Sequence, residues 1–197
     1  NIKNFLNKLS INPNKKIIVY PSRLTNWKGH LEFLDVFKKI SNENLFLYFV
    51  GDTKNQSYTA RVKHKINTLN LNNKCKILGN LNRDDLKIMF YLSSIIVSFP
   101  KQPEGFGRII SEALIMRKKI LAFNYGGVKD QLNELDDMYK VEPLKYDNLH
   151  IKLQNLIHIE DEKFLNISSN SRNYIIKHFS KEQMVKKYLN LYEQISV

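Results

Sequence analysis

The sequence predicts an α/β fold: a single domain built on a doubly wound, Rossmann-like parallel sheet, followed by a helical C-terminal tail. Short apolar segments recur along the chain, and amphipathic segments lie between them. Apolar runs of this length are typical of strands buried on both faces, and apolar residues three or four positions apart indicate helices. Strands that alternate with helices need right-handed crossovers, which produce a parallel sheet with helices on both faces.

The predicted strands are the near-continuous apolar segments at residues 17–20, 45–50, 75–78, 95–99 and 119–123. Between them, helical spacing of apolar residues is found within residues 33–40, 62–69 and 86–90.

The last third of the sequence has a different pattern. Apolar residues within 151–157, 164–167 and 185–195 keep helical spacing, and no clear strand separates these segments. Ser180 lies three residues before Gln183, which is the arrangement of a capping box at the start of a helix. We therefore expect consecutive helices here.

Composition favours a soluble globular domain. The 197 residues, 43% of them apolar, suffice for one core. Cys75 is the only cysteine, which excludes an internal disulfide and a multi-cysteine zinc site, and its apolar neighbours predict a strand residue. No apolar run reaches the length of a membrane span, and the N-terminus lacks the apolar core of a signal peptide. The expected location is the cytoplasm.

The chain is basic, with 31 Lys and Arg against 19 Asp and Glu and a net charge of +12. This charge favours anionic partners, namely nucleotide diphosphates, acidic lipid surfaces or nucleic acid, and does not choose among them. No nucleic-acid-binding motif is found, so specific nucleic-acid binding is not expected. The five histidines are scattered, mostly over polar helical stretches, and no pair has metal-ligand spacing, so no metal site is expected.

The loops after the predicted strands are where a ligand should be sought, because doubly wound sheets bind ligands beyond the carboxyl ends of their strands. In the first loop, Arg23 and Lys28 lie five positions apart, and Gly29 precedes a helix. Arg offers a planar fork to phosphate oxygens and Lys a mobile charge, so the pair is a candidate anion clamp. A solvated surface pair is the alternative.

Two further loops carry weaker signals. Gly51 and Asp52 follow the second strand, where Gly51 permits a tight turn and Asp52 could cap a helix or touch a ligand. Leu78 and Gly79 end the third strand, where exposed backbone groups could read the edge of a nucleobase. An ordinary turn is the alternative for both loops.

The strongest pattern is the segment from Glu104 to Glu112, which leads from the fourth strand into a helix. The two carboxylates are eight residues apart, one in the loop and one in the helix, so both can face one ligand. Gly105 and Gly107 remove side chains where a diphosphate or sugar must lie against backbone N–H groups at the helix N-terminus. Glu112 could then accept hydrogen bonds from ribose hydroxyls, and Glu104 from the sugar.

An adjacent glycine pair, Gly126 and Gly127, follows the fifth strand and opens another helix. Two glycines at this place suit the close approach of a ligand, and a simple turn is the alternative.

Taken in chain order, these loops resemble the C-terminal domain of glycosyltransferase family 4, whose members are retaining enzymes of GT-B fold that use nucleotide-activated sugars. The resemblance covers nearly the whole chain. It is carried by Arg23-Leu24 with Lys28-Gly29, Val50-Gly51-Asp52, Leu78-Gly79, Glu104-Gly105-Phe106-Gly107 with Glu112-Ala113, and Gly126-Gly127 with Asp130. The glutamate pair in its glycine context is specific, and the other motifs are weak singly. Ser22, where glycine is common, and the bulky Asn124-Tyr125 depart from the family pattern.

The resemblance implies a role for each site residue. Arg23 and Lys28 would hold the donor diphosphate, Glu112 its ribose, and Glu104 the transferred sugar. The donor would be linked to UDP or GDP, and basic side chains and helix termini, instead of a metal, would neutralise the leaving group. The catalytic set is then Glu104, Arg23 and Lys28, and further donor-binding residues are Gly51, Leu78, Gly105, Phe106, Gly107, Gly126 and Gly127.

The resemblance also implies an incomplete enzyme, because family members bind the acceptor with an N-terminal domain of similar size. Residues 1–197 would be the C-terminal domain alone, beginning at the linker or just before its first strand. The expected acceptor is an envelope glycan, such as lipopolysaccharide, or another lipid-linked acceptor, reached by peripheral contact with anionic lipid at the inner membrane face. A free-standing nucleotide- or phosphosugar-binding module is the alternative. A dinucleotide-dependent oxidoreductase is disfavoured, because no Gly-x-Gly-x-x-Gly follows the first strand.

Overall fold

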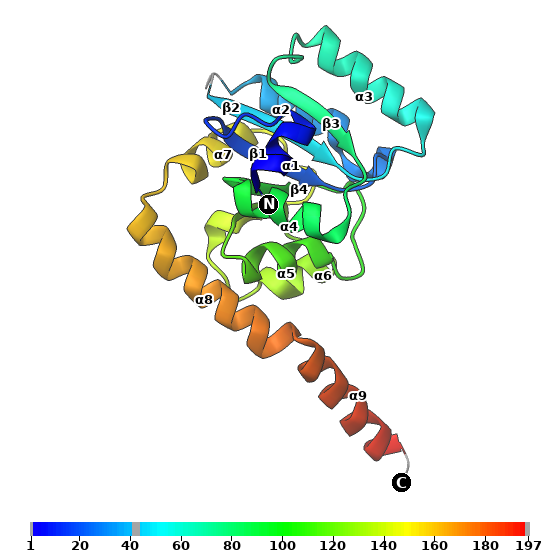
Figure 1. The fold of residues 1–197 in the computed structure, drawn as a ribbon. Helices are drawn as coiled ribbons and strands as arrows, with labels where there is room; N and C mark the ends of the chain where they lie inside the picture. Colours follow the sequence, from blue (N-terminus) through cyan, green and yellow to red (C-terminus); the bar gives the residue numbers. More distant parts are fainter. Residues whose placement is uncertain (1, 41–43, 196–197) are drawn as a thin grey trace.

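The computed structural model describes residues 2–40 and 44–195 and confirms the predicted α/β fold (Figure 1). A six-stranded sheet has the order β3-β2-β1-β4-β5-β6, and every neighbouring pair is parallel. The strands are β1 Lys16–Pro21, β2 Leu45–Val50, β3 Cys75–Gly79, β4 Ile95–Ser98, β5 Lys119–Phe123 and β6 Lys140–Val141. Each of the five predicted strands is present, with ends within one residue of the expected ones.

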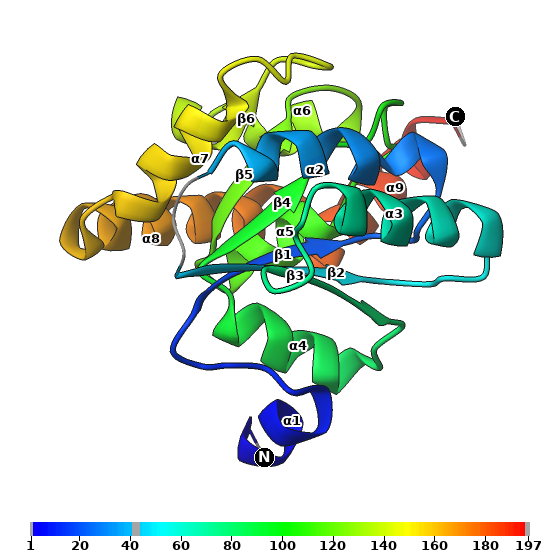
Figure 2. The same ribbon diagram turned by 90° about the horizontal axis from the view of Figure 1, so that it is seen from above.

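Helices cover both faces of the sheet (Figure 2). α2, α3 and α7 pack on one face, and α1, α4, α5, α6 and α8 pack on the other. The α-helices are α1 Ile2–Leu9, α2 His30–Lys38, α3 Gln56–Thr68, α4 Arg83–Leu92, α5 Arg108–Ile115, α6 Gly127–Leu132, α7 Leu149–His158, α8 Asp161–Phe179 and α9 Lys181–Ile195. Short 3-10 helices lie at Asn26–Lys28 and Asp137–Tyr139.

The central strands are buried on both faces, as their apolar runs predict. In β1, Ile18 and Tyr20 enter the core beneath α2, while Ile17 and Val19 enter the opposite core. The prediction of two-sided burial is wrong for β3, where only Cys75 is buried. β3 is an edge strand that pairs with β2 alone, so its remaining residues are partly exposed.

Besides the two short 3-10 helices, one α-helix and one strand were not predicted from the sequence. Residues 2–9, expected to be linker, form α1, which packs against α4 through the buried Phe5. The C-terminal third, expected to lack a strand, begins with β6, which pairs with β5. β6 has two residues, which is too short to show any periodicity.

The predicted helical tail is confirmed, and the amide of Gln183 donates to Ser180 Oγ at 3.3 Å, as an N-cap requires. α9 extends away from the sheet (Figure 1) and contains no buried residue between Lys181 and Ile195. Its large exposed apolar side chains include Met184, Val185, Tyr188, Leu189, Leu191 and Ile195. Among the described residues, no helix combines the length and apolar character needed to cross a membrane.

Candidate functional site

The candidate site lies where the two halves of the sheet meet. β1 and β4 are neighbours, the chain continues from β1 to one edge of the sheet, and it continues from β4 to the other edge. At such a switch point the following loops diverge and leave a crevice beyond the carboxyl ends of the strands. The two loops with the strongest predicted chemistry follow these two strands, and a backbone hydrogen bond of 2.6 Å from Lys101 N to Trp27 O joins them.

Tyr20, which the sequence analysis did not single out, holds the two loops together. Its buried hydroxyl accepts a hydrogen bond from Phe99 N at 2.9 Å and donates to the carbonyl of Lys28. Burial raises the pKa of this phenol well above its usual value, so the hydroxyl stays neutral. Gly29 has φ +76°, and a Cβ there would lie 2.1 Å from Phe99 O, so only glycine lets the loops approach this closely.

Lys28 and Glu104, both predicted site residues, form an ion pair that joins the loop after β1 to the loop after β4. Their side chains are 14% and 15% exposed, and the Lys28 ammonium also lies 4.1 Å from the centre of the Trp27 ring. Burial and, secondarily, the positive charge of Arg23 lower the pKa of Lys28 to about 8. The site therefore already holds a partly desolvated cation.

Arg23 is exposed, and the loop after β2 fixes its backbone. Leu24 N donates to Asp52 O at 2.8 Å, and a Cβ on Gly51 would lie 2.1 Å from Ser22 O. Gly51 thus permits a close approach of the Arg23 loop, whereas the sequence prediction for this glycine was a tight turn.

Asp52 does not cap the next helix, which corrects one of its two expected roles. Its carboxylate accepts from Lys54 N at 2.7 Å, and Asn55 caps α3 by accepting from Tyr58 N at 3.0 Å. Leu78 is half-buried and packs on the core beneath α4, while the carbonyl of Gly79 accepts from Gly51 N at 2.8 Å.

The segment around Glu104 and Glu112 is open to solvent at the start of α5. Gly105 and Phe106 are exposed, and no atom lies within 4 Å of a Cβ built on Gly105. Gly107, with φ +75°, immediately precedes α5, and Glu112 is exposed in the helix. An exposed helix N-terminus behind glycines is a favourable place for an anion.

The glycine pair after β5 supports this loop from behind. Gly127 N donates to Glu104 O at 2.9 Å, and a Cβ on Gly127 would lie 2.1 Å from Gly105 O. Gly126 is exposed with φ +58°. The contact seen here is with protein backbone, and direct contact of either glycine with a ligand stays a prediction.

Two further polar residues near the loops were missed. Gln131 in α6 is fully buried and donates to the carbonyl of Phe106. His30, expected with the other histidines to lie on a polar stretch, is fully buried and stacks on Tyr20 with ring centres 4.9 Å apart. Burial and then the charge of Lys28 lower the His30 pKa to about 3, so the ring is neutral. A polar residue on an otherwise apolar helix face was the available signal for both.

No group of three or more His, Cys, Asp and Glu side chains arranged for a metal ion is found within residues 2–40 and 44–195.

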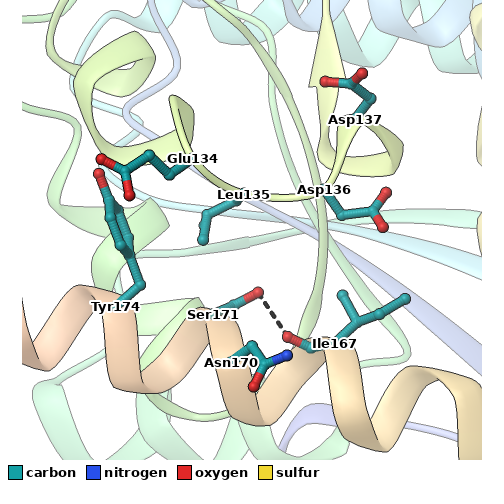
Figure 3. Close-up of a pocket in the computed structure, with 8 residues that line it drawn as sticks. All are labelled: Glu134, Leu135, Asp136, Asp137, Ile167, Asn170, Ser171 and Tyr174. Carbon is teal, nitrogen blue, oxygen red and sulfur yellow. Dashed lines mark hydrogen bonds between the residues drawn. The ribbon is translucent and has the colours of Figure 1, made fainter.

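A cavity of about 640 Å³ lies elsewhere, between α8 and the segment that precedes β6 (Figure 3). Because a segment leading into a parallel strand lies at the amino end of the sheet, this cavity is at the edge opposite the candidate site. Its lining includes the carboxylates of Glu134, Asp136 and Asp137. These negative charges would repel a nucleotide diphosphate, so this cavity does not fit the ligand that the sequence predicts, despite its volume.

Gly105 and Gly127 contact each other, but alanine substitutions at the two positions should affect stability differently. Gly127→Ala should lower the free energy of unfolding by about 2 kcal/mol, because its Cβ overlaps the Gly105 carbonyl. Gly105→Ala, which has open space, should change it by less than about 0.5 kcal/mol. Denaturant unfolding of both variants measures this, and equal losses would contradict the packing described.

The fold and sequence of this chain are similar to those of known glycosyltransferases. A glycosyltransferase from Rickettsia africae superimposes with a TM-score of 0.90, at 32% identity over 98% of this chain and 51% of its own. Anabaena HepE, solved with UDP-glucose, has a TM-score of 0.82 at 23% identity over 99% and 52% of the two chains. Lipopolysaccharide 1,2-N-acetylglucosaminetransferase of Salmonella typhimurium is 19% identical over 94% of this chain and 50% of its own.

The chain thus spans about half the length of these relatives. The sequence also matches, over residues 1–174, the family described as glycosyl transferases group 1. Since this match covers most of the 197 residues, the chain belongs to the group 1 glycosyltransferases, which have the GT-B fold.

Proposed function

We propose that this chain is the donor-binding half of a retaining, family 4 hexosyltransferase that binds a nucleotide-activated sugar. The observation that carries the proposal is the Lys28–Glu104 pair at the switch point of the sheet, in a chain of glycosyltransferase type. In this proposal, Lys28 would supply a cation for the leaving diphosphate directly beside the Glu104 carboxylate, which would bind the sugar.

The diphosphate would bind between the first loop and the start of α5. Arg23 is exposed, and it lowers the pKa of Lys28, so the two cations act on the same region. A bound diphosphate would relieve their mutual repulsion and meet the N–H groups at the N-terminus of α5. As charge develops on the leaving group, these donors stabilise it without a metal, and losing one donor should raise the barrier by about 3 kcal/mol.

The nucleoside and sugar would occupy the two sides of the diphosphate. Glu112 would accept hydrogen bonds from the ribose, and the backbone at Leu78 would face the base. Glu104 would accept from hydroxyls of the transferred sugar, beside the backbone of Phe106 and Gly107. Open space over Gly105 supports this placement. Gly126, which is exposed, would let the donor approach the backbone, whereas Gly51 and Gly127 would contribute by letting the loops around the donor pack closely.

A donor linked to UDP is favoured over one linked to GDP, because the similar Anabaena structure holds UDP-glucose. The Salmonella relative acts on lipopolysaccharide, which supports an envelope glycan or lipid-linked acceptor here as well. Enzymes of this kind would work at the cytoplasmic face of the membrane, and the net charge of +12 favours contact with anionic lipid there.

An acceptor-binding domain is the proposed partner of this chain. The relatives are about twice as long, and α9 carries an exposed apolar face. α9 carries Lys181, Lys186 and Lys187 against Glu182 and Glu193, which leaves a net charge of only +1. An amphipathic helix with so little excess positive charge suits a protein surface better than an anionic bilayer, so α9 is the expected contact with that domain.

The proposed donor site predicts selective nucleotide binding. Calorimetric titration without metal should show tighter binding of UDP than of GDP or ADP. Arg23→Ala and Glu112→Ala should each weaken UDP binding about tenfold to a hundredfold, because each removes a charged hydrogen-bonding partner. Lys163→Ala and Glu162→Ala, which make the same charge changes at the start of α8, are the controls. If the Kd for UDP is unchanged in all four variants, the nucleotide binds elsewhere.

The lowered pKa of Lys28 predicts pH-dependent donor binding. Lys28 is charged below its pKa of about 8 and loses its charge above it, whereas a nucleotide diphosphate is fully ionised from about pH 7 upward. The Kd for UDP should therefore rise about tenfold between pH 7 and pH 9. In Lys28→Arg the rise should vanish, because arginine keeps its charge. A rise of equal size in this variant would assign the titration to another group.

A further inference from the structure

We propose that Gln131 is a positioning residue that fixes the conformation of the segment Glu104–Gly107, and with it the recognition of the donor sugar. Gln131 belongs to α6, behind the segment, and is fully buried. This inference rests on the proposed function, in which the segment contacts the sugar.

The amide of Gln131 uses both of its donors and its carbonyl oxygen. Nε2 donates to the carbonyls of Phe106 and, at 3.2 Å, Gly127. Oε1 accepts from Ser111 Oγ at 2.5 Å. Because the carbonyls of Phe106 and Gly127 can only accept hydrogen bonds, the amide nitrogen must face them, and Oε1 is left to accept from the Ser111 hydroxyl. One side chain thus connects α5, α6 and the segment between β4 and α5.

The segment needs a restraint from outside, because its own sequence supplies little. Phe106 lies between two glycines, which have the largest conformational freedom of any residue. Gly107 adopts φ +75°, and no atom lies near a Cβ position on Gly105. Two hydrogen bonds hold its backbone directly, one to the Phe106 carbonyl and one from Gly127 N to Glu104 O. Two of its side chains are held by the Lys28–Glu104 ion pair and by the contact of the Phe106 ring with Phe179.

Packing alone does not explain a glutamine at this position. The neighbouring residues of α6, Val128 and Leu132, are 2% and 0% exposed and apolar. An apolar side chain at 131 would fill the same space without the cost of burying an amide, which is recovered only when its hydrogen bonds are made. Ser111, 8% exposed in α5, is a second polar residue at the same interface.

The test compares Gln131→Met with Leu132→Met in this chain. Gln131→Met keeps an unbranched side chain of similar length and removes all three hydrogen bonds, whereas Leu132→Met alters packing one position away and removes none. Calorimetry gives the Kd for UDP and for UDP-glucose, and hydrogen–deuterium exchange reports on residues 104–108. Thermal unfolding measures stability.

Gln131→Met should bind UDP within about twofold of the unsubstituted chain and UDP-glucose about tenfold more weakly, the equivalent of one lost hydrogen bond. Exchange in residues 104–108 should become faster. Ser111→Ala, which leaves both donors of Gln131 in place, should show a smaller change of the same kind. Leu132→Met should lower stability without changing the ratio of the two Kd values.

The inference is wrong if Gln131→Met keeps both the UDP-glucose Kd and the exchange rate of residues 104–108, or if Leu132→Met changes them equally. If the unsubstituted chain binds neither UDP nor UDP-glucose, the proposed function fails instead. The exchange comparison still decides in that case whether Gln131 holds the segment.

Discussion

The parallel pairing of β1 with β4 is the constraint on which the rest of the structure depends. It sets Ile18 beside Ile95 and Val19 beside Ile96, and it brings together the loops that follow the two strands. A two-residue slip would move one loop by about 7 Å along the sheet, which is enough to separate Lys28 from Glu104. The two helical layers depend on the same pairing. From β1 the strand order continues to one edge of the sheet and from β4 to the other, so right-handed crossovers place their helices on opposite faces.

The fold was predictable where burial imposes a pattern. β1, β2, β4 and β5 are buried on both faces, so their sequences are apolar runs that cannot be mistaken for loops. β3 was found from its apolar residues, although as an edge strand it is only partly covered. β6 and α1 were not found, because pairing with β5 and contact with α4 define them, and neither contact is written in the local sequence.

The position of the candidate site at the strand ends was predictable, the residues that support its loops were not, and the roles of the site residues stay predictions. Lys28, Glu104 and the glycines are residue types with evident roles at strand ends, and the structure brings Lys28 and Glu104 into contact. Tyr20 and Gln131 were missed, because a tyrosine in a strand and a glutamine in a helix look ordinary until their partners are known. Their hydrogen bonds reach residues 79 and 25 positions away in the chain.

The supporting residues are neutral for a physical reason. A charge buried behind the loops would cost several kcal/mol unless paired, so the groups that fix the geometry are a phenol, an uncharged imidazole and an amide. The charged groups, Lys28, Glu104 and Arg23, lie on the loops themselves, where they are partly or fully exposed to solvent. Lys28 is already partly neutralised by Glu104, so a ligand must offer more than one negative charge to compete for it. A diphosphate meets this condition and a neutral sugar does not, so in the proposed function the nucleotide would compete with Glu104 for Lys28 and the sugar would be held through the nucleotide.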